Sequence, residues 1–332
     1  MRHALEILRF DLAEQLRRTP NYVFFALLFA LGLGVTAFFG SRFQQLMGGS
    51  VPTFANAPSV VVTAMRMLTL LGMLGMAGSV FARAATKDFE HDFDGLLVTT
   101  GVREWQFVVG RLFACWLTAL AVLMAVPLGL AIGLVLPTNL PEHVGPFSLR
   151  AYLHGLAFHV LPQVLVVGTF VFALALLMRR TLWVYLGAFV VLLLPGLPLQ
   201  PLKWMGWSRA VEFLRLNSAP DLRIASTWVP TERNVQALPI PAELLGNRLV
   251  WLALGALLVF LLARRFRFTQ GPLAIGQMPG LQRLRGVGDR LLPASPPAAV
   301  ERAGQGPAAV RSGQLRPAPQ AVRPRRDLGA RL

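Results

Sequence analysis

Long apolar runs alternate with short polar segments through the first 268 residues of the chain. Six runs are candidates for helices that cross a bilayer, which takes about 17 to 25 apolar residues. They span residues 22–39, 60–81, 107–136, 153–178, 182–199 and 249–263. The third is long enough to tilt, and the last is short for a span. The pattern predicts an all-α integral membrane protein whose membrane domain covers residues 21–268.

Residues 1–20, ahead of the first run, follow an amphipathic pattern. Leucines recur at intervals of three to four residues, while charged side chains occupy the rest of the helical wheel. The leucines are Leu5, Leu8, Leu12 and Leu16. We expect an interfacial elbow helix that lies along the inner leaflet and ends near Pro20. An ordinary membrane-proximal helix fits the pattern equally well. No small-residue cleavage site closes the first run, so we expect a retained anchor and not a signal peptide.

A short charged segment separates the second and third runs. At helical spacing its apolar residues share one arc, and carboxylates border that arc on both sides. The arc holds Phe89, Phe93, Leu96 and Leu97, and the carboxylates are Asp88, Glu90, Asp92 and Asp94. The segment is therefore expected to form a helix on a surface and not a span.

Basic residues indicate the orientation of the spans, because Lys and Arg near span ends are retained in the cytoplasm. With the N-terminus inside, the cytoplasmic ends would hold Arg17, Arg18, Arg83, Lys87, Arg103, Arg111, Arg179, Arg180, Arg264, Arg265 and Arg267. The short outer loops contain little beyond Arg42 and Arg150. An even number of spans then places both termini in the cytoplasm.

Composition supports the membrane assignment. Hydrophobic residues make up 55% of the chain and charged residues 14%, which a soluble domain rarely reaches. The net charge is +16, but the basic residues lie at the ends of runs and in the tail, so we expect no nucleic acid partner. The single cysteine, Cys115, excludes an internal disulfide.

Two further segments lie outside the apolar runs. Prolines recur from residue 195 to residue 241 and predict short interfacial helices instead of one long helix. Residues 269–332 are rich in Pro, Ala, Gly and Arg, with no apolar periodicity, and cannot bury a core. We expect a disordered basic cytoplasmic tail. A biased or misread coding end is the alternative.

Catalytic motifs are not found in the sequence. It contains no P-loop and no His-Glu-x-x-His helix, and Ser79 lacks the Gly-x-Ser-x-Gly turn. His154 and His159 are five residues apart, on nearly opposite sides of an α-helix, so we expect satisfied or water-facing histidines and not metal ligands. Arg66, the ionisable residue within a span, is expected to snorkel. We expect no enzyme activity, no resident cofactor and no metal site. An intramembrane enzyme would require the two histidines to converge with a serine.

Taken together, these features resemble the type 2 membrane subunits of ABC exporters. The resemblance rests on the elbow, the six-span plan, residues 88–103 and the Gly110-Arg111 pair. Residues 228–234 and 244–251 resemble a subgroup in which the permease is often joined, through a second membrane half, to an aminopeptidase-like zinc domain. This chain has Gly101 where many relatives have proline, and it has the tail where larger relatives continue. The expectation is a half-transporter without peptidase activity.

The resemblance implies a function for the charged segment, as the coupling region that docks on a separate ABC ATPase subunit. The implied coupling residues are Asp88, Phe89, Glu90, Asp92, Phe93, Asp94, Leu96, Leu97, Thr99 and Thr100. ATP and Mg would be bound by that partner, and a second copy or a homologous half would complete the permease in the inner (plasma) membrane. Lipids, peptides and hydrophobic drugs all remain open as substrates. The main alternative is a membrane anchor or assembly factor for an ATPase or peptidase partner, without transport.

Overall fold

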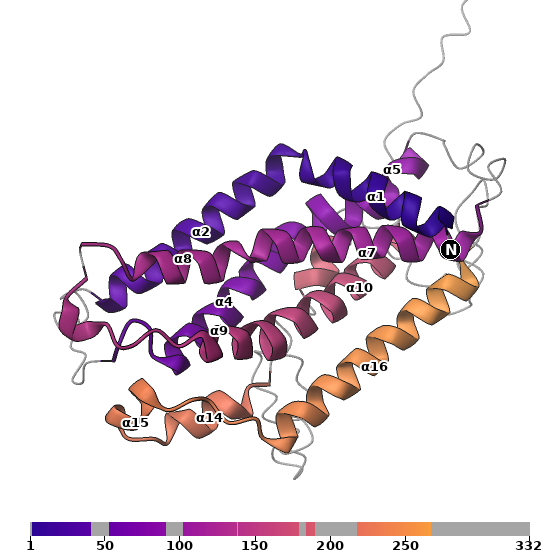
Figure 1. Cartoon of the computed structure of the whole chain (residues 1–332). Helices are drawn as coiled ribbons and strands as arrows, with labels where there is room; N and C mark the ends of the chain where they lie inside the picture. The colour runs from indigo at the N-terminus through magenta and orange to yellow at the C-terminus, as the bar shows by residue number, and fades with distance from the viewer. Residues whose placement is uncertain are drawn as a thin grey trace, which may run out of the picture. The chain divides into compact units, whose positions relative to one another are not determined.

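All regular structure in the described part of the chain is helical. The computed structural model describes residues 2–40, 53–90, 102–137, 139–178, 184–189 and 218–266. The chain divides into two units, residues 1–278 and 279–332, and every described residue belongs to the first. Within this part, five helices are long and apolar enough to cross a membrane. The all-α prediction is confirmed for the described residues (Figure 1), and the five helices are consistent with a multi-pass membrane protein.

The first three candidate spans begin after a separate N-terminal helix. That helix is α1 (Arg2–Leu16), and the first span is α2 (Thr19–Gly40). The second span consists of α4 (Pro58–Met76), a π-helical turn η1 (Ala77–Ala82) and α5 (Arg83–Glu90). The third consists of α7 (Glu104–Leu123) and α8 (Ala125–Gly133). These bounds agree with the predicted runs to within a few residues, except that α5 extends the second span to the charged segment.

The remaining helices complete the described part. A short 3-10 helix, η2 (Pro141–His143), precedes the fourth span, which contains α9 (Leu149–Gly155), a second π-helical turn η3 (Leu156–Val160) and α10 (Leu161–Met178). Two short helices follow, α14 (Pro220–Ser226) and α15 (Pro230–Val235), then the span α16 (Ala242–Arg265). Short helices are thus present, as predicted, in the described end of the proline-rich segment, and residues 195–217 lie outside the described residues. Most of the predicted 182–199 span and all of the predicted tail lie outside the described residues.

The core lies where the second, third and fourth spans meet. Its largest fully buried side chains include Met65, Met76, Phe81, Phe107 and Phe172. These helices satisfy their backbone hydrogen bonds internally, as a span must when no water is available. Helix α10 packs against both η1 and α16, which brings the last described span beside the fourth. The fold is therefore built around the α4–η1, α7 and α10 elements.

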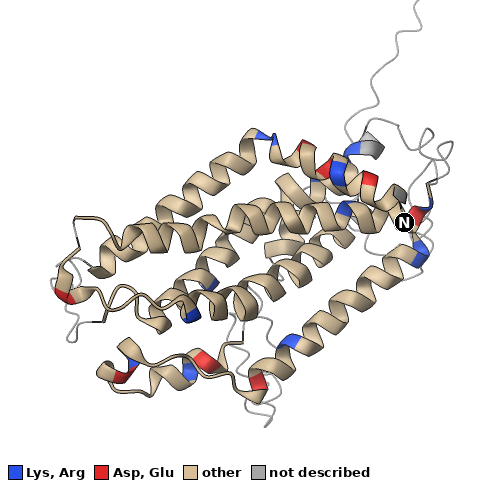
Figure 2. Ribbon diagram, viewed as in Figure 1, with Lys and Arg blue, Asp and Glu red and all other residues tan. Residues whose placement is uncertain are grey.

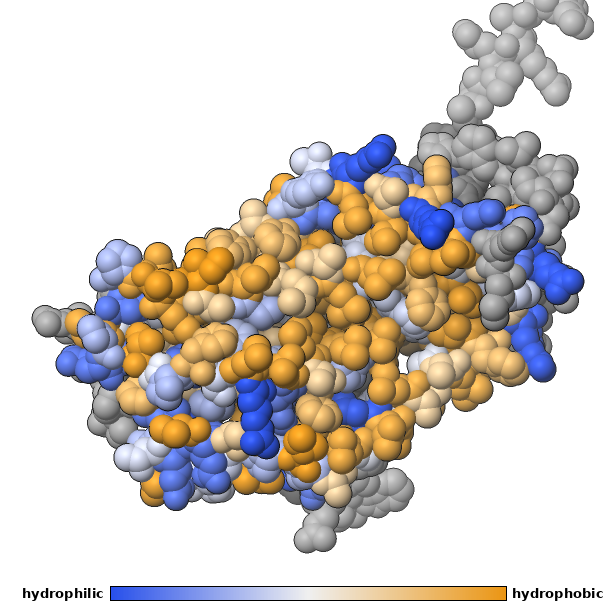
Figure 3. Space-filling model, in the orientation of Figure 1, coloured by the Kyte–Doolittle hydropathy of each residue, from blue (hydrophilic) through white to orange (hydrophobic). Residues whose placement is uncertain are grey.

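Apolar side chains also cover the outside of the described unit. Figure 3 shows them as a broad band, and Leu249 is 67% exposed and Leu254 48% exposed on α16. Charged residues are found mostly toward the helix ends, and α2 and α8 contain none (Figure 2). A soluble protein rarely exposes so much continuous apolar surface. This distribution is the one expected of a multi-pass membrane protein.

Helices α2 and α8 approach closely because glycines face each other. A Cβ added at Gly32 would lie 2.9 Å from the carbonyl oxygen of Val126 and 3.2 Å from the Cα of Gly129. Small residues at such a contact let two backbones approach, which strengthens packing within a membrane. The α2–α8 pair therefore depends on the missing side chain at Gly32.

We expect Gly32→Leu to lower the free energy of unfolding by about 1–3 kcal/mol, because the new side chain would push against the α8 backbone. The measurement is denaturant unfolding of the detergent-solubilised protein. Gly34→Leu is the matched control, since a Cβ at Gly34 meets nothing within 4 Å and leucine favours the helix. Equal losses for the two variants would contradict the close approach.

Candidate functional site

The predicted coupling region begins on α5 and ends just before α7. Asp88, Phe89 and Glu90 are the last residues of α5. The other predicted coupling residues lie outside the described residues, and they are Asp92, Phe93, Asp94, Leu96, Leu97, Thr99 and Thr100. The chain is described again from Val102, and the side chain of Gln106 accepts a hydrogen bond from the Arg103 N–H at the start of α7. The structure thus describes the helices on either side of the segment, α5 before it and α7 after it.

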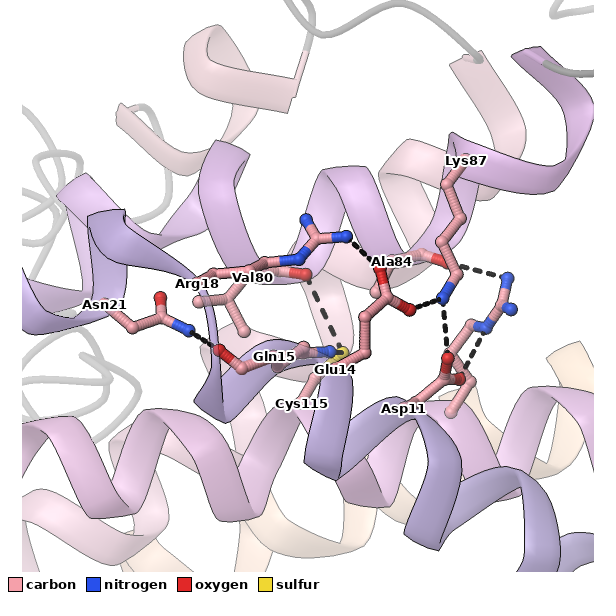
Figure 4. Close-up of polar contacts among 10 residues, drawn as sticks. Asp11, Glu14, Gln15, Arg18, Asn21, Val80, Ala84, Lys87 and Cys115 are labelled. Atoms are coloured by element: carbon pink, nitrogen blue, oxygen red, sulfur yellow. Dashed lines mark hydrogen bonds and ion pairs between the residues drawn. The ribbon is translucent and has the colours of Figure 1, made fainter. Parts of the chain in front are cut away.

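A buried carboxylate on α1 connects these two helices. Asp11 is 1% exposed, and its two oxygens accept from different helices. Its Oδ1 lies 2.6 Å from Nζ of Lys87 on α5, and its Oδ2 lies 2.9 Å from Nε of Arg111 on α7. Figure 4 shows the side chains of Asp11 and Lys87 pointing toward each other. Asp11 therefore joins α1, α5 and α7 at one point.

Glu14 and Arg18 enlarge this arrangement into a charge network of five residues, Asp11, Glu14, Arg18, Lys87 and Arg111. Oε2 of Glu14 lies 2.5 Å from Nζ of Lys87, and its other oxygen pairs with Arg18 one helical turn away (Figure 4). Arg111 also donates to the carbonyl oxygen of Ala84, at 2.9 Å, on α5. Because its charges are paired and hydrogen-bonded, the network can persist where a lone charge would be expelled.

Part of the polar face of α1 packs inward. Gln15 is buried beside Asp11, and its Nε2 lies 3.4 Å from the Sγ of Cys115 on α7. A Cβ at Gly110 of α7 would lie 2.6 Å from the carbonyl oxygen of Ala4, so the two helices touch closely. Some apolar residues point the other way, with Phe10 70% exposed, while Ile7 packs against the core. A helix is present where one was predicted, and its place at a membrane interface stays a prediction.

Electrostatics favours the ionised form of Glu14. Burial alone would raise the pKa of this carboxyl, but the hydrogen bonds and positive charges of Lys87 and Arg18 outweigh that effect and lower the pKa below its ordinary 4.5. The folded state therefore binds the Glu14 proton more weakly than the unfolded chain does.

A second polar cluster lies at the start of the fourth span. The Nε2 atoms of His154 and His159 lie 2.9 Å and 2.8 Å from the same oxygen, Oδ2 of Asp221 on α14. All three residues are buried. We call this group the His–Asp cluster. The prediction that the two histidines lie on opposite sides of the helix is wrong.

The π-helical turn η3 explains the difference. In an α-helix, residues five apart are separated by about 140° around the axis. In a π turn the hydrogen bonds join residues five apart, so such residues lie above one another. Because η3 begins two residues after His154 and contains His159, both rings reach the same carboxylate. Asp221 was not singled out by the sequence, since it lies 62 residues beyond His159 in a proline-rich segment.

Arg248 on α16 supports the same region. Its Nε donates to the carbonyl oxygen of Phe158 at 2.6 Å, and its Nη2 donates to that of Ser218 at 2.9 Å. The same Nη2 lies 3.4 Å from Nδ1 of His159. Arg66, which is partly buried on α4, attracts the Asp221 carboxylate electrostatically. The cluster thus joins α14 to three candidate spans.

Asp221 is held as a carboxylate. Burial would raise its pKa, but the hydrogen bonds from His154 and His159 dominate and keep the pKa well below its ordinary 3.8. Among the described residues, neither histidine hydrogen-bonds a serine hydroxyl.

Comparison with known proteins adds no family assignment. No protein-family model matches the chain, and no curated protein gives a significant match.

We expect Asp11→Asn to lower the free energy of unfolding by about 3 kcal/mol, because it removes the charge that compensates the buried Arg111. Denaturant titration of the solubilised protein measures the change. Glu6→Gln, on the same helix, is the control, since the Glu6 side chain is 71% exposed and should contribute almost nothing. A loss at Asp11 no larger than that at Glu6 would show that the charge network does not stabilise the fold.

The lowered pKa of Glu14 predicts an acid-sensitive contribution to stability. A carboxyl whose pKa is lower in the folded state stabilises the fold above its unfolded pKa and loses that contribution as pH falls. We therefore expect Glu14→Gln to lower the melting temperature at pH 7, and the difference from wild type to shrink as the pH falls below 4.5. Melting curves between pH 7 and pH 3.5 measure it, with Glu6→Gln as control. A difference that stays constant with pH would contradict the prediction.

Proposed function

We propose that this chain is the membrane subunit of an ATP-driven ABC exporter in the inner (plasma) membrane. In this proposal six spans form the permease half, with residues 182–199 as the fifth span and both termini in the cytoplasm. A separate ATPase subunit binds ATP and Mg and hydrolyses the nucleotide. A second copy or a homologous half completes the pathway. The support is the all-helical fold with five candidate spans, together with the charge network at the base of the predicted coupling region.

The position of Lys87 is the observation that carries this proposal. Lys87 precedes Asp88, the first predicted coupling residue, and its ammonium group contacts both Asp11 and Glu14 on α1. Asp11 in turn pairs with Arg111 on α7, the helix that follows the coupling region. A displacement of α5 would therefore pull on α1 and α7 together. Unless the three helices move as one, the distances within these ion pairs increase and the pairs break.

The displacement would then reach the rest of the fold through packing. Helix α7 continues into α8, and α8 lies along α2, where the backbones touch at Gly32. Helix α5 continues from η1, which packs on α10. Packed interfaces of this kind move as units instead of deforming smoothly. In this proposal the displacement of α5 thus couples the charged segment to the first four spans.

The coupling region would dock on the ATPase through an apolar arc with a charged rim. In this proposal Phe89, Phe93, Leu96 and Leu97 enter a groove of the partner, and Thr99 and Thr100 end the segment. The carboxylates of Asp88, Glu90, Asp92 and Asp94 would meet basic residues at the rim, which favours specificity and rapid association.

The test separates docking from coupling. The tagged chain is purified from its native cell, and a co-purifying ATPase with a P-loop is identified by mass spectrometry. Both proteins are then reconstituted in lipid bilayers, and ATP turnover is compared with that of the ATPase alone. We expect the wild-type chain to stimulate turnover. Lys87→Gln should retain the partner but lose most of the stimulation, because it cuts the link from α5 to α1 outside the docking residues.

Two further variants fix the interpretation. Arg9→Gln removes an exposed positive charge from α1 outside the network and should behave as wild type. Replacing Asp88, Glu90, Asp92 and Asp94 together by alanine should lose the partner. If the wild-type chain retains an ATPase without changing its turnover in a bilayer, the anchor hypothesis replaces the exporter. If no ATPase is recovered, the exporter proposal fails, and only an anchor for a peptidase partner remains of the alternative.

A further inference from the structure

The His–Asp cluster has the donor set of a metal site. Imidazole nitrogens and a carboxylate oxygen are common ligands of zinc and related ions. The ligand atoms of His154, His159 and Asp221 lie within 4.8 Å of one another. Each comes from a buried side chain, with Asp221 0% exposed. A buried, convergent set of this kind offers three bonds to one ion.

Two independent observations point to a ligand at this place. The π-helical turn η3 brings the two histidines onto the same side of the fourth span, and π turns within α-helices are frequent at functional sites. The second oxygen of Asp221, Oδ1, is buried with no hydrogen-bond partner in the described residues. An orphaned carboxylate oxygen is costly in such a place unless something binds it.

We propose that His154, His159 and Asp221 form a site for a divalent transition-metal ion of the Zn²⁺ class. The ion would take Nε2 of each histidine and a carboxylate oxygen of Asp221, which leaves a fourth position for water or another ligand. Since α14 contributes the carboxylate and the fourth span contributes the imidazoles, the ion would fasten α14 to that span. This site is independent of the proposed exporter function.

The surrounding charges determine which ions can bind. Arg248 and Arg66 add positive charge near the single carboxylate. Calcium and magnesium need several hard oxygen ligands, and one carboxylate beside two arginines does not supply them. Ions that form strong bonds to imidazole depend less on the total charge of the site. Zn²⁺ and Co²⁺ therefore fit the site better than Ca²⁺ or Mg²⁺.

Binding requires a small rearrangement of the cluster. Ligand atoms around tetrahedral zinc lie about 3.3 Å apart, so the present contacts of 2.8 and 2.9 Å would open slightly and the two rings would approach each other. Each Nε2 must present a lone pair, which places the ring proton on Nδ1. At His159 this displaces the 3.4 Å contact with Arg248, whose bonds to the carbonyl oxygens of Phe158 and Ser218 are shorter and can remain.

The test uses the full chain with a tag that contains no histidine, treated with a chelator and titrated with Co²⁺ in detergent. We expect one equivalent of Co²⁺ to bind with the visible absorption of a nitrogen- and oxygen-ligated ion, and Zn²⁺ to displace it. His154→Gln, His159→Gln and Asp221→Asn should each weaken binding by at least about tenfold. His3→Gln and His143→Gln should bind as wild type does.

A second measurement keeps the proposal testable if a variant unfolds. Zn²⁺ should raise the melting temperature of the wild-type chain, while Mg²⁺ at the same concentration should not. A folded His154→Gln variant should lose the Zn²⁺ shift. The proposal is overturned if the wild-type chain binds no stoichiometric Co²⁺, or if the ligand variants bind as tightly as the controls, which would indicate adventitious binding. Neither readout needs an ATPase, so failure here leaves the exporter proposal standing.

Discussion

The arrangement of the described helices at the base of α5 depends on one constraint, that the carboxylate of Asp11 is buried and must be paired. A buried charge without a partner costs several kcal/mol, so the helices that can supply cations are held to it. Lys87 and Arg111 meet this requirement from two different spans. Helix α1 thus connects α5 and α7, the helices on either side of the charged segment. The ion pairs of Asp11 hold α1 in this position.

Burial makes this pairing stronger, and α1 departs in part from the usual arrangement of an amphipathic helix. In water, α1 would turn Phe10 and its leucines toward the protein and leave Asp11 and Gln15 outside. In the structure Phe10 is exposed and the two polar residues are buried, while Glu6 and Arg9 also remain exposed. Such an orientation is favourable when the outer surface meets acyl chains instead of water, because polar groups then find partners only inside the protein. The exposed apolar surface of α16 fits the same explanation.

The sequence alone predicts the helices well and the polar clusters poorly, for physical reasons. Apolar runs such as residues 153–178 determine where spans lie, because length and hydrophobicity are local properties. The link between Asp11 and Lys87 joins residues 76 positions apart, and an amphipathic reading assigns Asp11 to the polar surface. The convergence of His154 and His159 could not be predicted, because no pattern in the local sequence indicates a π turn. Asp221 sits in a proline-rich segment that predicts only short helices.

The charge network and the His–Asp cluster are built in the same way. The second span has Lys87 at its α5 end, in the charge network, and Arg66 near its beginning on α4, beside the His–Asp cluster. In each cluster a helix that lies outside the spans, α1 or α14, inserts one buried carboxylate among cations and donors from several spans. A carboxylate held in this way lets a peripheral helix move with the spans but resists its separation from them. Between the two clusters the second span is held mainly by apolar packing, with Met73, Met76 and Phe81 fully buried, so each cluster anchors one end of a helix that the core fixes along its length.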